Sequence, residues 1–104
     1  MNWNTNEKKN LVKAILLLNN TNEAESFLRD LLTKTEIEEF SRRLETASML
    51  SRGIHYSAIE EKTGFSSTTI ARVSKWLKNG MGGYKKIIHR LHTVNPKLAR
   101  RGLS

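Results

Sequence analysis

Cysteine is absent from this chain of 104 residues, and proline occurs only once, at Pro96. The chain therefore has no disulfide framework and no thiolate ligands for a metal. No apolar run approaches the roughly 20 residues that span a bilayer. Residues 1–10 are polar and asparagine-rich, so they lack the apolar middle of a signal peptide. We expect a soluble, cytoplasmic protein with no membrane partner.

Acidic residues are missing from the last 39 positions. Residues 66–104 carry nine basic and no acidic side chains, whereas residues 1–65 carry nine basic and ten acidic ones. The formal net charge of +8 therefore arises in the C-terminal part. A basic block of this kind favours a polyanion partner, because released counterions drive basic proteins onto phosphate backbones. A merely solvated basic surface is the alternative interpretation.

Apolar residues recur at helical spacing along the chain, and glycines stand at the breaks. We predict a single all-α domain over residues 1–104, with about six helices. Because the N-terminal helices are rich in leucine for so small a body, we also predict a homodimer. The expected parts are dimerisation and core helices at 7–53, a helix-turn-helix at 56–78, a C-terminal helix at 81–93 and a basic tail at 94–104.

Several helix starts are indicated by a Ser, Thr or Asn followed three residues later by Glu, the spacing of a capping box. The third helix is ended by Gly53, and its apolar side chains share one face: Ile37, Phe40, Leu44, Ala47 and Leu50. The predicted caps are Thr21 or Asn22 for the second helix, Thr33 with Glu36 for the third, and Ser57 with Glu60 for the fourth.

The stretch from residue 56 to residue 77 is typical of a helix-turn-helix, in which two short helices meet across a tight turn. Gly64 supplies the residue that tolerates positive φ in the turn. Ile59, Ile70 and Val73 are spaced to point inward and lock the crossing, and Phe65 can fill the angle between the helices. An ordinary helical hairpin is the alternative interpretation.

The second helix of this motif is the predicted recognition helix, because its outward positions are short hydroxyl residues followed by basic ones. Such a helix can insert its N-terminal end into the major groove, where hydroxyls bond bases or phosphates. Base contacts specify the sequence, whereas phosphate contacts position the protein. The candidate DNA-binding residues are Ser66, Ser67, Thr68, Thr69, Ala71, Arg72, Lys75, Lys78, Lys85 and Lys86.

Three stretches of the chain are distinctive as sequence: LLT at 31–33, FSRRLETA at 40–47 running on to 53, and the segment 63–74. In these stretches the chain resembles the Trp repressor family, and most closely its YerC/YecD branch, over roughly residues 9–92. The resemblance implies an intertwined all-helical dimer. It also implies two helix-turn-helix heads that bind successive major grooves of a double-stranded DNA operator.

The resemblance further implies an effector pocket at Thr33, Arg43 and Arg72. Val73 and Trp76, however, place apolar bulk where the indole and amino group of tryptophan would sit. We therefore expect no cofactor and no tryptophan corepressor, and the sequence names no other effector. In the alternative that we favour, the two arginines make structural or phosphate contacts.

No catalytic pattern or metal site is predicted, so the leading hypothesis is a sequence-specific transcriptional regulator, a repressor, and not an enzyme. His89 and His92 have a spacing that could hold a metal, but surface histidines beside phosphate are the preferred interpretation. One alternative is a DNA-targeting module related to those of transposases or replication initiators. Another is a purely structural helical dimer with an incidental basic tail.

Overall fold

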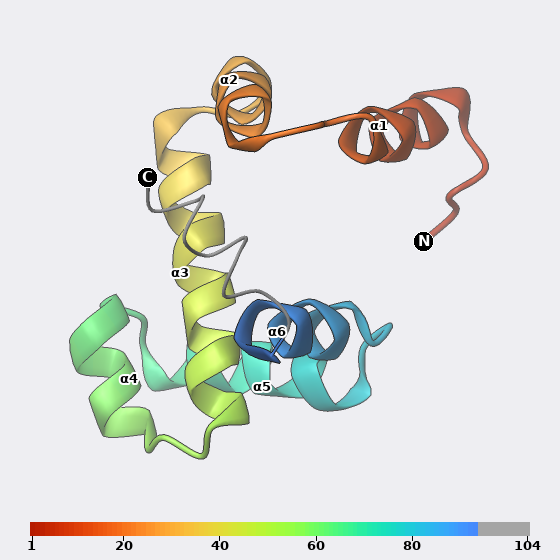
Figure 1. The fold of residues 1–104 in the computed structure, drawn as a ribbon. Coiled ribbons are helices and arrows are strands. Elements are labelled where there is room, and N and C mark those ends of the chain that lie inside the picture. Colours follow the sequence, from red (N-terminus) through yellow and green to blue (C-terminus); the bar gives the residue numbers. More distant parts are fainter. Residues whose placement is uncertain (94–104) are drawn as a thin grey trace. The chain divides into compact units, whose positions relative to one another are not determined.

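The computed structural model describes residues 1–93, which form helices joined by short connections (Figure 1). No strand occurs in this range, so the predicted all-α fold is confirmed there. The predicted basic tail at 94–104 lies outside the described residues. The helices are α1 (Asn6–Leu16), α2 (Thr21–Leu31), α3 (Lys34–Ser51), α4 (Tyr56–Thr63), α5 (Ser67–Asn79) and α6 (Gly83–Thr93).

Contacts divide the chain into two units, and the first comprises residues 1–37 with α1 and α2. Neither of these helices buries a residue. Apolar side chains remain exposed on both, including Leu16 on α1 and Leu31 on α2. An amphipathic helix draws most of its stability from packing its apolar face. The two helices of the first unit therefore present apolar surface without a core of their own.

Two of the predicted helix caps are wrong. The side chain of Asn20 caps α2, and its backbone is extended, with φ −158° and ψ 174°. Thr21 and Asn22 already lie inside that helix, because Asn20 is one position ahead and takes the capping role. In the same way α4 begins before Ser57. His55 is its N-cap residue and makes no side-chain capping bond, and its carbonyl accepts the first backbone hydrogen bonds.

The predicted capping box at the start of α3 is confirmed. The Glu36 backbone N–H donates to Thr33 Oγ1 over 3.1 Å, and the Thr33 backbone N–H donates to Glu36 Oε1 over 2.8 Å. These hydrogen bonds satisfy two donors that a helix start leaves without partners. The bonds to Thr33 also hold the pKa of Glu36 below its ordinary value of 4.5.

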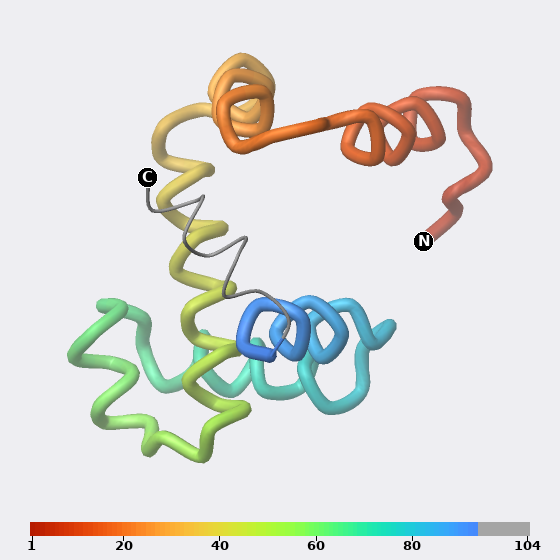
Figure 2. The backbone as a smooth tube through the Cα atoms, viewed as in Figure 1, coloured from red at the N-terminus to blue at the C-terminus, as the bar shows by residue number. Residues whose placement is uncertain are grey.

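In the second unit, from residue 38 onward, α4, α5 and α6 gather around the C-terminal half of α3 (Figures 1 and 2). One buried cluster joins three of these helices. Ala47 of α3 meets Val73 and Leu77 of α5 and Ile88 of α6. Because burying an aliphatic side chain stabilises by about 1.5–3 kcal/mol, this cluster attaches both α5 and α6 to the long helix.

Candidate nucleic-acid interface

The turn between α4 and α5 has the geometry that the sequence predicts. Gly64 ends α4 in the left-handed region, with φ 77° and ψ 1°, and its N–H donates to the Glu60 carbonyl over 2.8 Å. The Thr63 hydroxyl donates to the Ile59 carbonyl over 2.7 Å and accepts from the Phe65 N–H over 3.2 Å. The polar groups of this tight turn therefore have partners within the motif itself.

A second buried cluster locks the two helices of the motif onto α3. Ile59 of α4 and Ile70 of α5 are both fully buried and pack with Met49 of α3. Phe65, at the turn, is half-buried against the same cluster. The inward positions predicted from the sequence are confirmed. The angle between α4 and α5 is therefore set by side chains from three helices.

The first turn of α5 uses part of its hydroxyl set for its own capping. Ser66 is the N-cap residue, and its Oγ accepts from the Thr69 N–H over 3.2 Å. The hydroxyls of Ser66 and Thr69 also lie 3.2 Å apart, within hydrogen-bond distance. Thr69 is partly buried, whereas Ser67 and Thr68 are exposed. Of the four predicted hydroxyl contacts, Ser67 and Thr68 are thus the two left to address a ligand.

An exposed stripe runs along the rest of α5, opposite its buried side. Ala71, Arg72, Lys75 and Lys78 are exposed, whereas Val73, Ser74 and Leu77 are buried. Residues three and four positions apart share a helix face, so the predicted contacts from Thr68 to Lys78 form one continuous surface. The helix therefore offers hydroxyls near its N-terminal end and cations further along.

Within residues 1–93, the cations of this region have no acidic partner. Lys85 and Lys86 are exposed on α6, which the buried Ile88 fixes to α5. The ion pairs within residues 1–93 involve other cations, namely Arg43 of α3, Arg52 directly after it and Lys62 of α4. The basic side chains of α5 and α6 are Arg72, Lys75, Lys78, Lys85, Lys86 and Arg90, and they are therefore available to phosphates.

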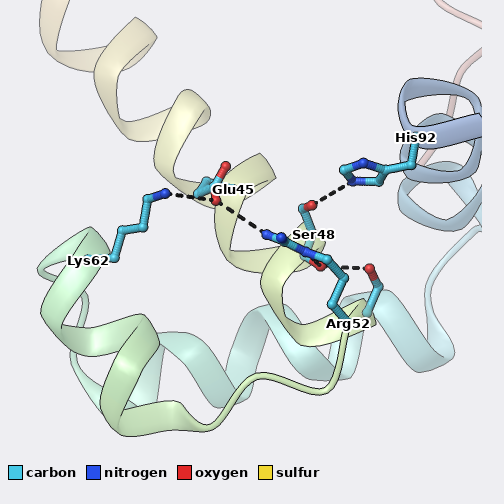
Figure 3. Close-up of polar contacts among 6 residues, drawn as sticks. Glu45, Ser48, Arg52, Lys62 and His92 are labelled. Atoms are coloured by element: carbon cyan, nitrogen blue, oxygen red, sulfur yellow. Dashed lines mark hydrogen bonds and ion pairs between the residues drawn. The ribbon is translucent and has the colours of Figure 1, made fainter. Parts of the chain in front are cut away.

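A polar network that the sequence did not predict crosses α3 between α4 and α6 (Figure 3). Glu45 Oε1 lies 3.6 Å from Lys62 Nζ and 3.7 Å from Arg52 Nη2. On the other side, Ser48 Oγ lies 2.9 Å from His92 Nε2. His92, which the sequence predicts to be a surface residue beside phosphate, therefore contacts α3. No local spacing could indicate a pair 44 residues apart.

The three candidate effector residues have different surroundings. Thr33 is engaged in the capping box with Glu36. Arg43 Nη2 pairs with Glu39 Oε2 over 2.9 Å, and the Arg43 guanidinium carbon lies 5.9 Å from the ring centroid of Trp76. Arg72 is exposed on α5. Two of the three side chains thus have partners within the chain.

An open apolar groove of about 550 Å³ lies beside α5 and α6 in the second unit. Its wall is formed almost wholly by apolar side chains and glycines. Trp76 and Met81 are among the exposed large apolar residues of the chain. The groove is lined by Leu44, Trp76, Gly80, Met81, Gly83, Tyr84 and Ile87.

A family model, a curated protein and two solved structures match this chain over most of its length. The family model described as Trp repressor protein matches residues 6–92. The uncharacterized protein YerC of Bacillus subtilis is 39% identical over 85 residues, which is 82% of each chain.

Two solved structures also match, each at 40% sequence identity. One is the TrpR-like protein of Eubacterium eligens, with a TM-score of 0.83 over 88% of this chain and 94% of that one. The other is a candidate Trp repressor of Staphylococcus aureus, with a TM-score of 0.75 over 80% and 83%. Within residues 1–93, no helix is both long and apolar enough to cross a membrane.

Proposed function

This chain belongs to the Trp repressor family, and on that premise we propose that it is a homodimeric, sequence-specific DNA-binding regulator, acting as a repressor without enzymatic activity. The observation that carries the proposal is the exposed stripe of α5. It joins hydroxyls near a helix N-terminus to cations that have no acidic partner within residues 1–93, on a motif whose turn is held by its own hydrogen bonds. A recognition helix needs this combination to enter a major groove and hold the flanking phosphates.

Within this proposal, the residues divide by role. Ser67, Thr68 and Arg72 address base edges and the nearest phosphates, because they lie toward the N-terminal end of α5. Lysines further along α5 and on α6 hold the backbone, where they add affinity but no sequence information. Each helix-turn-helix head then combines a small surface that contacts bases with a larger basic surface that contacts phosphates.

The dimer follows from apolar surface that the chain leaves uncovered. The helices α1 and α2 bury no residue, and the second unit carries an apolar groove of about 550 Å³. Contiguous exposed apolar surface on a small protein marks a protein–protein interface. A second copy covering this surface would pair two helix-turn-helix heads. Light scattering at micromolar protomer concentration should then give twice the chain mass of 11.9 kDa, and a monomer mass would contradict this arrangement.

The regulator is also proposed to work without tryptophan. Val73 is buried, and Arg43 is already engaged with Glu39 and Trp76. An added ring would have to displace Trp76, because the Arg43 guanidinium carbon already lies 5.9 Å from the Trp76 ring centroid. Calorimetry with L-tryptophan should show no binding tighter than about millimolar, or roughly −4 kcal/mol. Micromolar binding accompanied by a gain in DNA affinity would contradict this part of the proposal.

Selection from random genomic fragments tests the DNA-binding function directly. Fragments retained by the protein should share a palindromic site with half-sites about one helical turn, or roughly 34 Å, apart. The matched control is a Thr68→Ala, Arg72→Ala double variant, which keeps the backbone-holding lysines and should enrich no common site. Retention of unrelated fragments by the unmodified protein would contradict sequence-specific recognition.

A further inference from the structure

The side chain of Arg43 connects the long helix α3 to α5. Its Nη2 lies 2.9 Å from Glu39 Oε2, and its guanidinium carbon lies 5.5 Å from the ring centroid of Phe40 and 5.9 Å from that of Trp76. Glu39 and Phe40 share α3 with Arg43, whereas Trp76 belongs to α5. Arg43 is therefore anchored on α3 and reaches across to the helix that presents the candidate DNA-binding stripe.

Arginine suits such a connection because its planar guanidinium can stack on aromatic rings while its N–H groups bond a carboxylate. A guanidinium within about 6 Å of a ring centroid is attracted by the ring quadrupole. Both rings are still about two-fifths exposed, at 43% for Phe40 and 42% for Trp76. The contact is therefore an addition to the buried core, on the flank of α5.

The position of Trp76 on α5 shows what this contact can control. Its neighbour Leu77 belongs to the buried cluster that attaches α5 to α3, whereas Lys75 on its other side belongs to the exposed stripe. Apolar packing holds one side of a helix without a directional bond. A contact to the flank opposes rotation of α5 about its own axis, and that rotation would turn the stripe.

We propose that Arg43, oriented by Glu39, is a positioning residue that holds α5 through Trp76 and so raises DNA affinity without touching DNA. The inference rests on the proposed DNA-binding function. Apparent affinity falls in proportion to the fraction of molecules in the binding-competent setting. Loss of a half-exposed cation–π contact of this kind lowers the binding-competent fraction of each head by about two- to five-fold. In a dimer the factors of the two heads multiply, to about four- to 25-fold.

The test compares Arg43→Met with Arg42→Met. Arg42 is the exposed neighbour on the same helix, so both variants remove one positive charge at nearly the same place. Both are made with Trp3→Phe, which leaves Trp76 as the only tryptophan. Affinity for the selected DNA site is measured across a salt series, and acrylamide quenching of Trp76 fluorescence is measured on the free protein. Urea unfolding checks that each variant is folded.

We expect Arg43→Met to bind DNA about four- to 25-fold more weakly than Arg42→Met, with the same salt dependence and more accessible Trp76 fluorescence. Arg43→Lys should recover part of the loss. Should Arg43→Met not fold, Glu39→Gln gives a smaller loss with the same signature. Equal affinities of the Arg43 and Arg42 variants would overturn the inference.

A loss accompanied by a flatter salt slope would also overturn it, because a lost phosphate contact changes the slope by about 0.9 per phosphate. Failure of the proposed function is seen separately, since the unmodified protein would then bind no DNA. The positioning role falls with it in that case. If the unmodified protein binds DNA, and Arg43→Met and Arg42→Met bind it with equal affinity, the DNA-binding function stands and the positioning role is refuted.

Discussion

Substitution of Gly64 by alanine isolates the backbone requirement of the helix-turn-helix. A Cβ built at Gly64 meets no atom within 4 Å, so the only obstacle is the positive φ of 77°. Holding a residue with a side chain in this left-handed region costs about 1–2 kcal/mol. Alanine also restricts the unfolded chain, which returns about 0.4–1 kcal/mol. We therefore expect Gly64→Ala to lower the free energy of unfolding by about 0.5–1.5 kcal/mol.

Gly83 provides a matched control for this substitution. A Cβ there also meets nothing within 4 Å, but Gly83 is the first residue of α6 and its φ is not positive. Backbone conformation therefore gives Gly83→Ala no cost, and this variant should lose less free energy of unfolding than Gly64→Ala, although Gly83 also lines the apolar groove. Urea unfolding of both variants at one protomer concentration measures the difference, because the stability of a dimer depends on concentration. Equal urea midpoints for the two variants would refute the argument from backbone conformation.

Four further substitutions test single side chains. Thr46 is fully buried, and its hydroxyl has no hydrogen-bond partner among residues 1–93. Thr46→Val should therefore raise the free energy of unfolding by about 1 kcal/mol, and a lower urea midpoint would contradict this. Glu36 has a lowered pKa through its bonds to Thr33, so its stabilising effect should be complete above about pH 4.5 and fade on acidification through its folded-state pKa. Glu36→Gln should remove that part of the acid dependence of unfolding, and identical pH profiles would argue against it. Thr68→Ala should relax base preference at one position of each half-site by about 1–3 kcal/mol. Lys85→Ala should instead weaken binding to all sequences alike. If both variants lost equal affinity for specific and random DNA, the assigned roles would be contradicted.

The helix-turn-helix could be predicted from the sequence because its signals are local. Gly64 is required by the turn, and the apolar positions Ile59, Ile70 and Val73 lie within nine residues of it. Each of these side chains is buried as the spacing predicts. Local spacing therefore sufficed to distinguish the inward positions from the exposed stripe of α5.

Helix starts were harder to predict where several capping residues follow one another. The side chains of Asn20, Thr21 and Asn22 can all accept a backbone hydrogen bond, and Asn20 is the one that caps α2. The helix α4 begins at Tyr56, although the His55 side chain does not cap it. The His55 backbone carbonyl accepts the first helical hydrogen bonds instead. The local pattern leaves such choices open, and the surrounding structure decides them.

Contacts between distant segments had no signal in the sequence. Arg43 and Trp76 lie 33 positions apart in the numbering, yet packing of α5 on α3 places guanidinium and ring within 5.9 Å. Phe40 and Leu44 share the predicted apolar face of α3, but more than a third of each side chain is exposed. Helical periodicity predicts which residues form the apolar face of a helix. It does not predict which other helix, of the same chain or of a partner, covers that face.

The salt dependence of DNA binding shows whether α5 and α6 contact the phosphate backbone. In each chain five exposed cations have no acidic partner within residues 1–93, namely Arg72, Lys75, Lys78, Lys85 and Lys86. A dimer presents two such sets. If the dimer neutralises roughly 6–10 phosphates, the logarithm of the affinity should fall with the logarithm of the salt concentration at a slope of about −5 to −9. A slope near zero would contradict the assignment of α5 and α6 to the phosphate backbone.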